Sequence, residues 1–395
     1  MIEHFLITLA AAAQAPQPAR AGETPPIVVT GERISDLSAR LAACLARNCP
    51  PDEDIDATLA LAEGLFVDGE YARAREQVSA SLGRNADEAK RYPEPVADLY
   101  RVHARLSRSL GHDKSALRST HGILAALEEG IPQPDHRHFT AQYEIAEVQL
   151  RMGRLQSAQE TLRDLAADAR RAGRQDVATQ AMLRTLWFEW LARPEGSARS
   201  RLERLARLAD PARRYESVGA KLILARILRQ EGKAQQAEEL VAGIGSGNSG
   251  VRRLLSAPNY VLVQQEIRDP GSDGAELMGV NVLNRLTENY EKKWVDVGFW
   301  INPDGRVADV ELLRKGGDAG WADPVLHSIR GRVYSAAAEP TFKVERYTMT
   351  AEYEPWTSSS GTRLPRRSPR ARVEYLDLTT SGDAPAAPTR PAGDN

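Results

Sequence analysis

One recurring spacing restricts the fold of this 395-residue chain more than any other feature of its sequence. In the middle of the chain a glycine is followed, five residues later, by an alanine, as in "GEYARA" and "GRLQSA". The first three glycines are separated by two equal intervals of 42 residues, which indicates a structural repeat. Gly196 continues the series, with Arg201 in place of the alanine. The matching pairs are Gly69 and Ala74, Gly111 and Ala116, Gly153 and Ala158, and Gly232 and Ala237.

Each matching glycine stands between two segments with the apolar periodicity of a helix, such as "AQYEIAEVQLRM" before Gly153. We interpret each unit as a helix, a tight turn that needs glycine, and an antiparallel second helix. The small alanine fits a position where the two helix backbones approach closely. A single hairpin cannot bury its apolar face, so neighbouring hairpins must stack. The sequence therefore predicts an all-α solenoid of about five helical hairpins over residues 52–245.

The segments "AEGLFVDGEYARA" and "AEVQLRMGRLQSA" resemble the tetratricopeptide repeat family, whose period of about 34 residues is shorter than the period found here. This departure predicts longer helices. The resemblance implies a concave groove that binds a peptide or protein, and it implies no catalysis. The alternative for each candidate groove residue is a solvated face or packing between repeats. The candidates are Tyr100, Arg101, Arg105, Tyr143 and Gln149.

After the stretch "GIGSGNSG", which indicates a linker, the periodicity changes from that of helices to the alternation of strands. Asp304 and Gly305 lie in "NPDGR", a turn signal between the first two strands. The last strand places Tyr347, Met349 and Tyr353 on one face. These elements define a small α+β domain within residues 251–356. The predicted elements are strands at 293–302, 306–314 and 343–354 and a helix at 321–332.

The stretch from Val295 to Glu339 resembles the C-terminal domain of the TonB family. The shared features are an alternating strand, a turn with Asp304 and Gly305, a second strand in "ADVELL" and an amphipathic helix. The resemblance implies the fold of that family and a surface that binds an extended peptide, another envelope protein or cell wall. Candidate contacts on this domain are Tyr347, Met349 and Tyr353.

The TonB family also implies a membrane-anchored rod that couples an inner-membrane motor to outer-membrane receptors. Such a transducer needs an uncleaved transmembrane helix and a long, stiff, proline-rich spacer. Here helical repeats stand in place of the spacer. We therefore expect the fold of the domain without the motor function, and an atypical energy transducer is the alternative.

The first 21 residues are typical of a secretory signal peptide, with an apolar run from Phe5 to Ala13 and an A-x-A-like cleavage site at Ala19-Arg20-Ala21. The apolar run is about half the length that spans a bilayer. Export to the periplasm is therefore expected, and the alternatives are a cytosolic protein or a start codon assigned too late. Residues 22–51 would then form an extended segment and a first helix.

Two cysteines, Cys44 and Cys49, lie near the end of this first helix. A helix end followed by a turn can bring their Cα atoms within the distance that a disulfide needs. An oxidising compartment favours the bridge, and two unpaired thiols are the alternative. A metal site is not indicated, because no histidine lies nearby and the spacing matches no zinc motif.

A lone strand-like segment, "PPIVVTGERI", follows the expected cleavage site. It resembles the short segment near the mature N-terminus of TonB-dependent outer-membrane receptors, which pairs with the TonB C-terminal domain by strand addition. Three interpretations stay open: the segment pairs with the chain's own C-terminal sheet, it pairs with a separate TonB protein, or it is an extended linker. The residues concerned are Ile27, Val28, Val29 and Thr30.

The tail, residues 357–395, begins with a basic run and ends in a stretch rich in proline and alanine, which is typical of disorder. The basic run is typical of a solvated linker, and peripheral contact with an anionic membrane is the alternative. Residues 371–379 are strand-like and would extend the edge of the sheet. The basic residues are Arg363, Arg366, Arg367, Arg370 and Arg372.

The sequence contains no recognisable catalytic motif, neither a P-loop nor G-x-S-x-G nor H-E-x-x-H. Asp135, His136 and His138 could ligate a metal, but they fit better as the start of a helix with Asp135 as its N-cap. The formal net charge of −2 gives no indication of nucleic-acid binding. We therefore expect a non-enzymatic periplasmic scaffold without cofactor or metal. Its expected partners are cell-envelope proteins, among them a TonB-dependent receptor or TonB itself.

Overall fold

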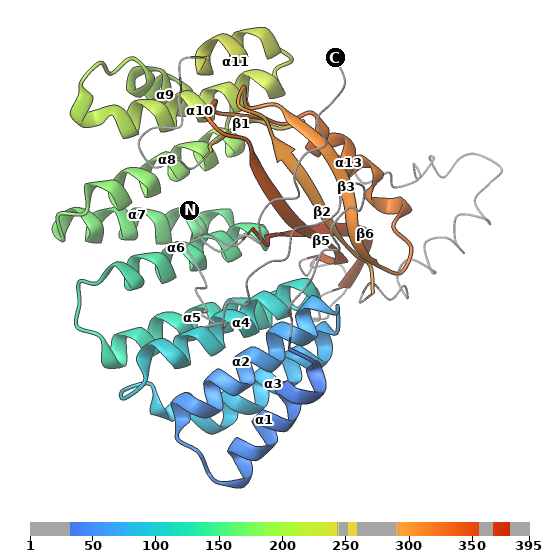
Figure 1. The fold of residues 1–395 in the computed structure, drawn as a ribbon. Coiled ribbons are helices and arrows are strands. Elements are labelled where there is room, and N and C mark those ends of the chain that lie inside the picture. The colour runs from blue at the N-terminus through green and yellow to red at the C-terminus, as the bar shows by residue number, and fades with distance from the viewer. Residues whose placement is uncertain are drawn as a thin grey trace.

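The computed structural model places a column of paired helices beside a unit built around a β-sheet (Figure 1). The architecture is α+β, with a TPR-like helical solenoid followed by a small sheet and its own helix. The predicted signal peptide, the Ile27–Thr30 segment and the proline- and alanine-rich end of the tail lie outside the described residues. The structure describes residues 32–242, 244, 252–258, 290, 292–354 and 366–379, with the side chains of 352–354 and 366–370 excepted.

Five helical hairpins form the solenoid in the described part of the chain, as the repeat predicts. Helix α1 (Ile34–Ala46) packs against the first hairpin at one end of the column. Several helices span 17 or 18 residues, which accounts for the long period. The hairpins are α2 (Pro51–Val67) with α3 (Tyr71–Asn85), α4 (Pro93–Ser109) with α5 (Asp113–Gly130), α6 (His136–Arg151) with α7 (Leu155–Arg171), α8 (Gln175–Ala192) with α9 (Ala198–Ala206), and α10 (Arg214–Gln230) with α11 (Ala234–Val241).

The repeated glycine follows the first helix of four hairpins and has a left-handed backbone, with φ between 70° and 80°. At the first turn Gly69 donates its N–H to the Phe66 carbonyl at 3.0 Å, and Glu70 donates to the Leu65 carbonyl at 2.8 Å. This pair of bonds is a Schellman motif, which satisfies carbonyl groups at the end of a helix. All four predicted alanines, Ala74, Ala116, Ala158 and Ala237, are fully buried.

Two glycines depart from the predicted series. Gly196 does not have a left-handed φ, and the connection from α8 to α9 is a different turn. Gly173 has a φ of 74° and joins α7 to α8, between two hairpins rather than within one. Gly173 also has an alanine five residues later, the buried Ala178. The spacing therefore marks a tight helix-turn-helix connection, whether it lies inside a hairpin or between two hairpins.

The first helices of successive hairpins contact one another, as α2 contacts α4 and α8 contacts α10. These helices therefore line the inner side of the column, and each second helix also packs on the next hairpin. One apolar cluster fills the helices of the first hairpins around Ile55, Leu65 and Leu99. A second cluster follows from α6 to α10 and includes Leu162 and Phe188.

The second half of the chain forms a four-stranded antiparallel sheet in the order β3-β2-β5-β6. The predicted order of hairpin, helix and strand is observed, and β6 is the edge strand that the pattern at 371–379 predicts. A separate two-stranded ladder pairs β1 (Leu254–Ser256) with β4 (Val333–Tyr334). The elements of the larger sheet are β2 (Trp294–Ile301), β3 (Val307–Gly316), α13 (Asp323–Arg330), β5 (Thr341–Glu354) and β6 (Arg366–Asp377).

The two faces of the sheet are both covered, but by different partners. One face packs against α13 and forms an apolar core from Val295, Val297, Phe299, Ile301, Val325 and Ile329. The opposite face carries polar side chains that are also buried, including Asp296, Arg346 and Thr348. This polar face lies against the helical column, and it contains the contacts described in the next subsection.

The turn between β2 and β3 has the geometry that its sequence predicts. Asp304 accepts a hydrogen bond from the Arg306 N–H at 2.9 Å, and Gly305 has a φ of 88°. A Cβ atom on Gly305 would lie 2.0 Å from the Tyr334 carbonyl oxygen. Both the backbone conformation and this close approach therefore require glycine at the turn.

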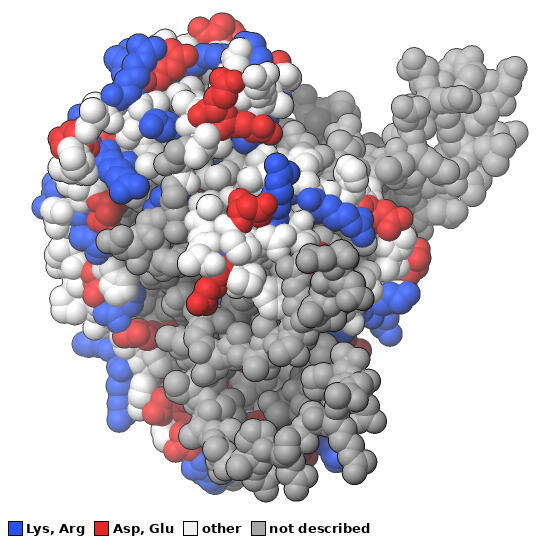
Figure 2. All heavy atoms as spheres, turned by 45° about the horizontal axis from the view of Figure 1, so that its top comes forward, with Lys and Arg blue, Asp and Glu red and all other residues white. Residues whose placement is uncertain are grey.

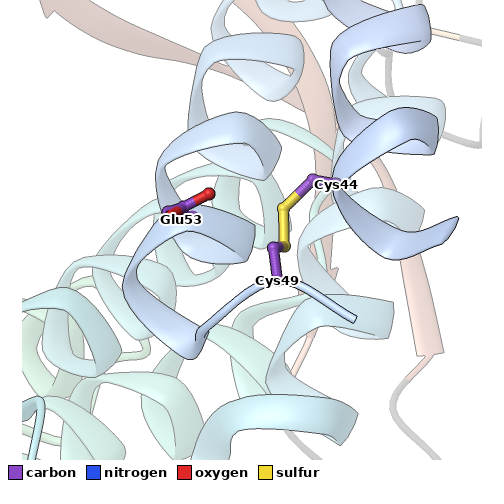
Figure 3. Close-up of side chains that lie close together, drawn as sticks. All are labelled: Cys44, Cys49 and Glu53. Carbon is purple, nitrogen blue, oxygen red and sulfur yellow. A yellow bond between two sulfur atoms is a disulfide. The ribbon is translucent and has the colours of Figure 1, made fainter. Parts of the chain in front are cut away.

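The predicted disulfide between Cys44 and Cys49 is present and joins the end of α1 to the start of α2 (Figure 3). The two Cα atoms are 5.1 Å apart, which lies within the usual range for a bridge. Glu53 lies beside the bridge on α2 and forms an ion pair with Arg47. The disulfide thus holds the first helix against the solenoid.

Two effects require glycine at position 69: its left-handed backbone and its close approach to Trp294 in the sheet. A pair of glycine-to-alanine variants can separate the two effects. Gly153→Ala should lower the free energy of unfolding by about 1 kcal/mol, through backbone strain alone. Gly69→Ala should lower it by more, because its Cβ would lie 2.0 Å from Trp294 Nε1, whereas the Gly153 Cβ would meet no atom within 4 Å. Urea unfolding of both variants measures the difference. Equal losses would contradict the contact with Trp294.

Candidate functional site

The sheet lies along the row of turns that join the two helices of each hairpin (Figure 1). At the far end of the column, Arg229 of α10 donates to the Leu255 carbonyl of β1 at 2.9 Å. The C-terminal unit therefore contacts the first, second, third and fifth hairpins. The helix residues that hydrogen bond to the four-stranded sheet are Phe66, Val67, Tyr71, Arg108, Asp113 and Arg151.

Arg346 on β5 is 1% exposed and joins the two parts of the molecule. Its Nε and Nη2 atoms donate to the Asp296 carboxylate of β2 at 2.6 and 2.9 Å. The same guanidinium donates to the carbonyls of Phe66 and Val67, the last residues of α2, with 2.9 Å to the Val67 oxygen. Helix α2 has no basic residue in its own last turn. Arg346 therefore supplies the cation that is favourable at a helix C-terminus.

Trp294 anchors the sheet in the helical column. Its ring belongs to the apolar cluster of the first hairpins rather than to the sheet's own core. The Arg346 guanidinium carbon lies 4.0 Å from the centroid of this ring and 5.1 Å from that of Phe66, in cation–π geometry. The buried cation is thus enclosed by two aromatic rings.

Strand β6 makes further ion pairs with the hairpin turns. Arg372 forms a bidentate pair with Asp113 at the start of α5, at 2.6 and 2.7 Å. Glu374 accepts a hydrogen bond from Arg151 at the end of α6, at 2.8 Å. The prediction of a solvated or lipid-binding run is therefore wrong for Arg372, because this side chain is engaged inside the molecule.

A row of ion pairs crosses the inner helices from one hairpin to the next. Arg101 of α4 pairs with Glu144 of α6 at 3.3 Å. Arg184 of α8 makes two hydrogen bonds with Glu147 of α6, at 2.7 and 2.8 Å. The partners are 43 and 37 residues apart, which is close to one repeat. Charges of both signs therefore recur along the inner face at the spacing of the hairpins.

Three of the predicted groove residues lie along this inner face. Arg101 takes part in the row of ion pairs, and Arg105 lies one turn further along α4, where the charge of Glu144 acts on it. Tyr143 is half-buried beside Glu147, and burial, followed by the charge of Glu147, raises its pKa to about 12. These three side chains keep their interpretation as candidate partner contacts.

The other two predicted groove residues take part in packing within hairpins. The Tyr100 ring lies against Gly122 of α5, where a Cβ would be 2.7 Å from two ring carbons. The Gln149 side chain accepts a hydrogen bond from Thr161 across the third hairpin at 2.9 Å. For these residues the structure shows the alternative that the sequence left open, packing inside the repeat.

Two of the three candidate contacts on the C-terminal domain are interior. Tyr347 is 1% exposed and packs in the core beneath α13, and Met349 is 8% exposed beside Tyr290. Neither side chain therefore reaches a surface that a partner could contact. The side chain of Tyr353 lies outside the described residues, so its role stays a prediction.

The face of the sheet that packs against α13 also contains a buried polar network, which the sequence did not predict. Glu345 of β5 is 1% exposed, and it accepts hydrogen bonds from Arg332 at 2.7 Å, from Tyr375 at 3.2 Å and from Tyr347. Burial, reinforced by the Glu345 charge, raises the pKa of Tyr347 far above its usual value. The alternation of β5 places Glu345 on the same face as Tyr347, which was the signal available.

The stretch with Asp135 begins a helix, as predicted. Asp135 is the N-cap of α6 and accepts a hydrogen bond from the Arg137 N–H at 2.9 Å. His138 is 3% exposed inside this helix. In the part of the chain that the structure describes, the grouping of possible metal ligands is Cys44, Cys49 and Glu53, and its two sulfur atoms are bonded to each other.

Figure 2 shows one face of the molecule, on which Lys and Arg side chains lie among Asp and Glu side chains. This mixture agrees with the formal net charge of −2. Among the helices that the structure describes, none has both the length and the apolar character that crossing a bilayer requires.

Comparison with solved structures finds helical-repeat proteins of low sequence identity. The TPR-like repeats of a Podosopora anserina putative kinesin light chain are 18% identical, with 49% of this chain and 92% of that chain covered and a TM-score of 0.36. BtubC from P. vanneervenii is 16% identical, with 53% and 87% covered and a TM-score of 0.40. The apo form of RapI is 14% identical, with 53% and 73% covered and a TM-score of 0.33. No family model and no curated protein sequence matches the chain.

The buried pair between Arg346 and Asp296 should contribute far more to stability than an exposed pair. Arg346→Met leaves two carbonyls at the end of α2 without their buried donor and leaves Asp296 with Arg314 as its remaining partner. We therefore expect a loss of about 3 kcal/mol in the free energy of unfolding. Arg213→Met, which removes an exposed pair with Glu216, should cost far less, because solvent screens that pair. Urea unfolding measures both, and a loss at position 346 no larger than the control would refute the anchoring role.

Proposed function

We propose that this protein is a non-enzymatic scaffold of the cell envelope that holds an extended segment of a protein partner on the inner face of its repeats. The row of ion pairs, Arg101 with Glu144 and Arg184 with Glu147, carries the proposal. These pairs present both signs of charge at the spacing of the hairpins, along the helices that line the inner side of the column.

The spacing of the row suits an extended chain. Packed helices lie about 8–10 Å apart, and an extended strand advances about 3.3 Å per residue. Successive inner helices would therefore meet every third residue of a bound segment. The charged side chains of such a segment could exchange partners with the ion pairs, and the half-buried ring of Tyr143 would add apolar contact area.

A second binding surface is proposed on the TonB-like C-terminal domain, at the free edge of β3. In the described residues β3 pairs with β2 only, so its outer edge is open to strand addition. The register between β2 and β3 shifts at two places, and such bulges twist an edge and limit the length that can pair. The four residues Ile27–Thr30 are a candidate of suitable length, from this chain or from a receptor.

The partner should be captured through the inner face. With a photo-crosslinking amino acid at Tyr143, ultraviolet irradiation of envelope fractions should yield one discrete adduct. Reversing the charge of the two arginines with Arg101→Glu and Arg184→Glu should reduce that adduct at least roughly tenfold. An acidic group of the partner would then face glutamate in place of arginine. The matched control is Arg163→Glu, an exposed position on α7. An adduct unchanged by the charge reversals would overturn the proposed site.

The location in the envelope is tested separately by sequencing the N-terminus of the mature protein. Export predicts a soluble periplasmic chain that begins near residue 22, and the disulfide between Cys44 and Cys49 supports an oxidising compartment. The order of hairpin, helix and strand in the TonB-like domain favours one alternative, an atypical energy transducer. An intact Met1 in the membrane fraction would support the transducer and contradict the periplasmic scaffold.

A further inference from the structure

A small cavity of about 20 Å³ lies where the end of α4 meets strands β5 and β6. This space is comparable to that of one water molecule or one monatomic ion, and it is too small for a tetrahedral oxyanion. The helical side of its wall is formed by Phe66, Arg105, Arg108 and Ser109. The side of the sheet is formed by Arg346, Thr348, Glu374, Tyr375 and Leu376.

Positive charge exceeds negative charge around this cavity. Arg346 shares the Asp296 carboxylate with Arg314, and the Glu374 carboxylate is already shared between Arg151 and Arg372. Arg105 and Arg108, in contrast, form no ion pair within 4.0 Å among the residues that the structure describes. Arg105 and Arg108 thus line the cavity without a carboxylate within ion-pair distance, and the charges of Glu63 and Glu144 act on Arg105 from further away.

Arg108 is the critical group, because its Nε atom is buried and reaches no hydrogen-bond partner in the described part of the chain. Burial, reinforced by the charge of Arg151, lowers the pKa of the Arg108 guanidinium to about 10. A buried donor without a partner and a buried cation without a counter-ion are each unfavourable. A group with negative charge inside the cavity would relieve both.

We propose that the cavity binds one halide ion, chloride in the cell, with the Arg108 Nε–H as its principal donor. Arg105 and Ser109 line the same cavity, and their side chains would complete the set of donors. The ion neutralises the contact between α4 and the sheet, so its binding strengthens the docking of the C-terminal unit on the helical column. Arg105 belongs both to this site and to the candidate contacts on the inner face, whereas Arg108, the principal donor, belongs to this site alone.

The first test compares thermal unfolding in sodium chloride and in sodium gluconate at the same ionic strength, because gluconate is too large for the cavity. The wild-type protein should melt on the order of 2 °C higher in chloride. Arg108→Gln should abolish this difference, and the exposed control Arg163→Gln should preserve it. Equal melting temperatures in the two salts for the wild type, or a difference that persists in Arg108→Gln, would overturn the proposal.

The second test does not depend on the folding of a variant. Crystals of the wild-type protein grown in bromide should show an anomalous-scattering peak within about 3.5 Å of the Arg108 Nε atom. Density there without anomalous signal would identify a water molecule and would overturn the halide site. Partner capture at Tyr143 should be unaffected in Arg108→Gln, which separates this site from the proposed function.

Discussion

The arrangement of the whole molecule depends on where the Arg346 guanidinium finds its partners. Asp296 belongs to the sheet, whereas the two carbonyl acceptors belong to the end of α2. A buried guanidinium is tolerated only when its donors are satisfied, and here that requires both parts of the chain at once. The contact therefore specifies one docking geometry, while the apolar area around Trp294 supplies much of the attraction.

Helix ends make the turn side of the column a suitable surface for a polar strand face. Each first helix presents carbonyl groups at its C-terminus, and each second helix begins with N–H groups that favour an acidic residue such as Asp113. Arg346 and Arg372 use these features at the first and second hairpins. The same logic explains why the polar face of the sheet is buried without being apolar.

The parts of the fold that follow from local pattern could be predicted from the sequence, and the parts that join distant segments could not. The glycine-alanine spacing predicted the hairpins, and the change to alternation predicted the sheet, because each depends on neighbouring residues. Phe66 and Arg346 are 280 residues apart, and no local signal connects a helix end with a strand. For the same reason the sequence predicts a solvated run at Arg372 and a surface contact at Tyr347. The partners that bury these side chains, Asp113 and α13, lie elsewhere in the chain. On the inner face, Arg101, Arg105 and Tyr143 were predictable from helical periodicity, but their ion-pair partners on the next hairpin were not.

The position of the C-terminal unit also bears on the shape of the inner face. A stack of repeats usually flexes like a spring, since each repeat contacts only its neighbours. Here the C-terminal unit contacts the first hairpin through Arg346 and the last hairpin through Arg229. It therefore bridges the two ends of the stack and restricts its bending. If this attachment fixes the curvature of the stack, the inner face would select the proposed partner segment by its length as well as by its charge.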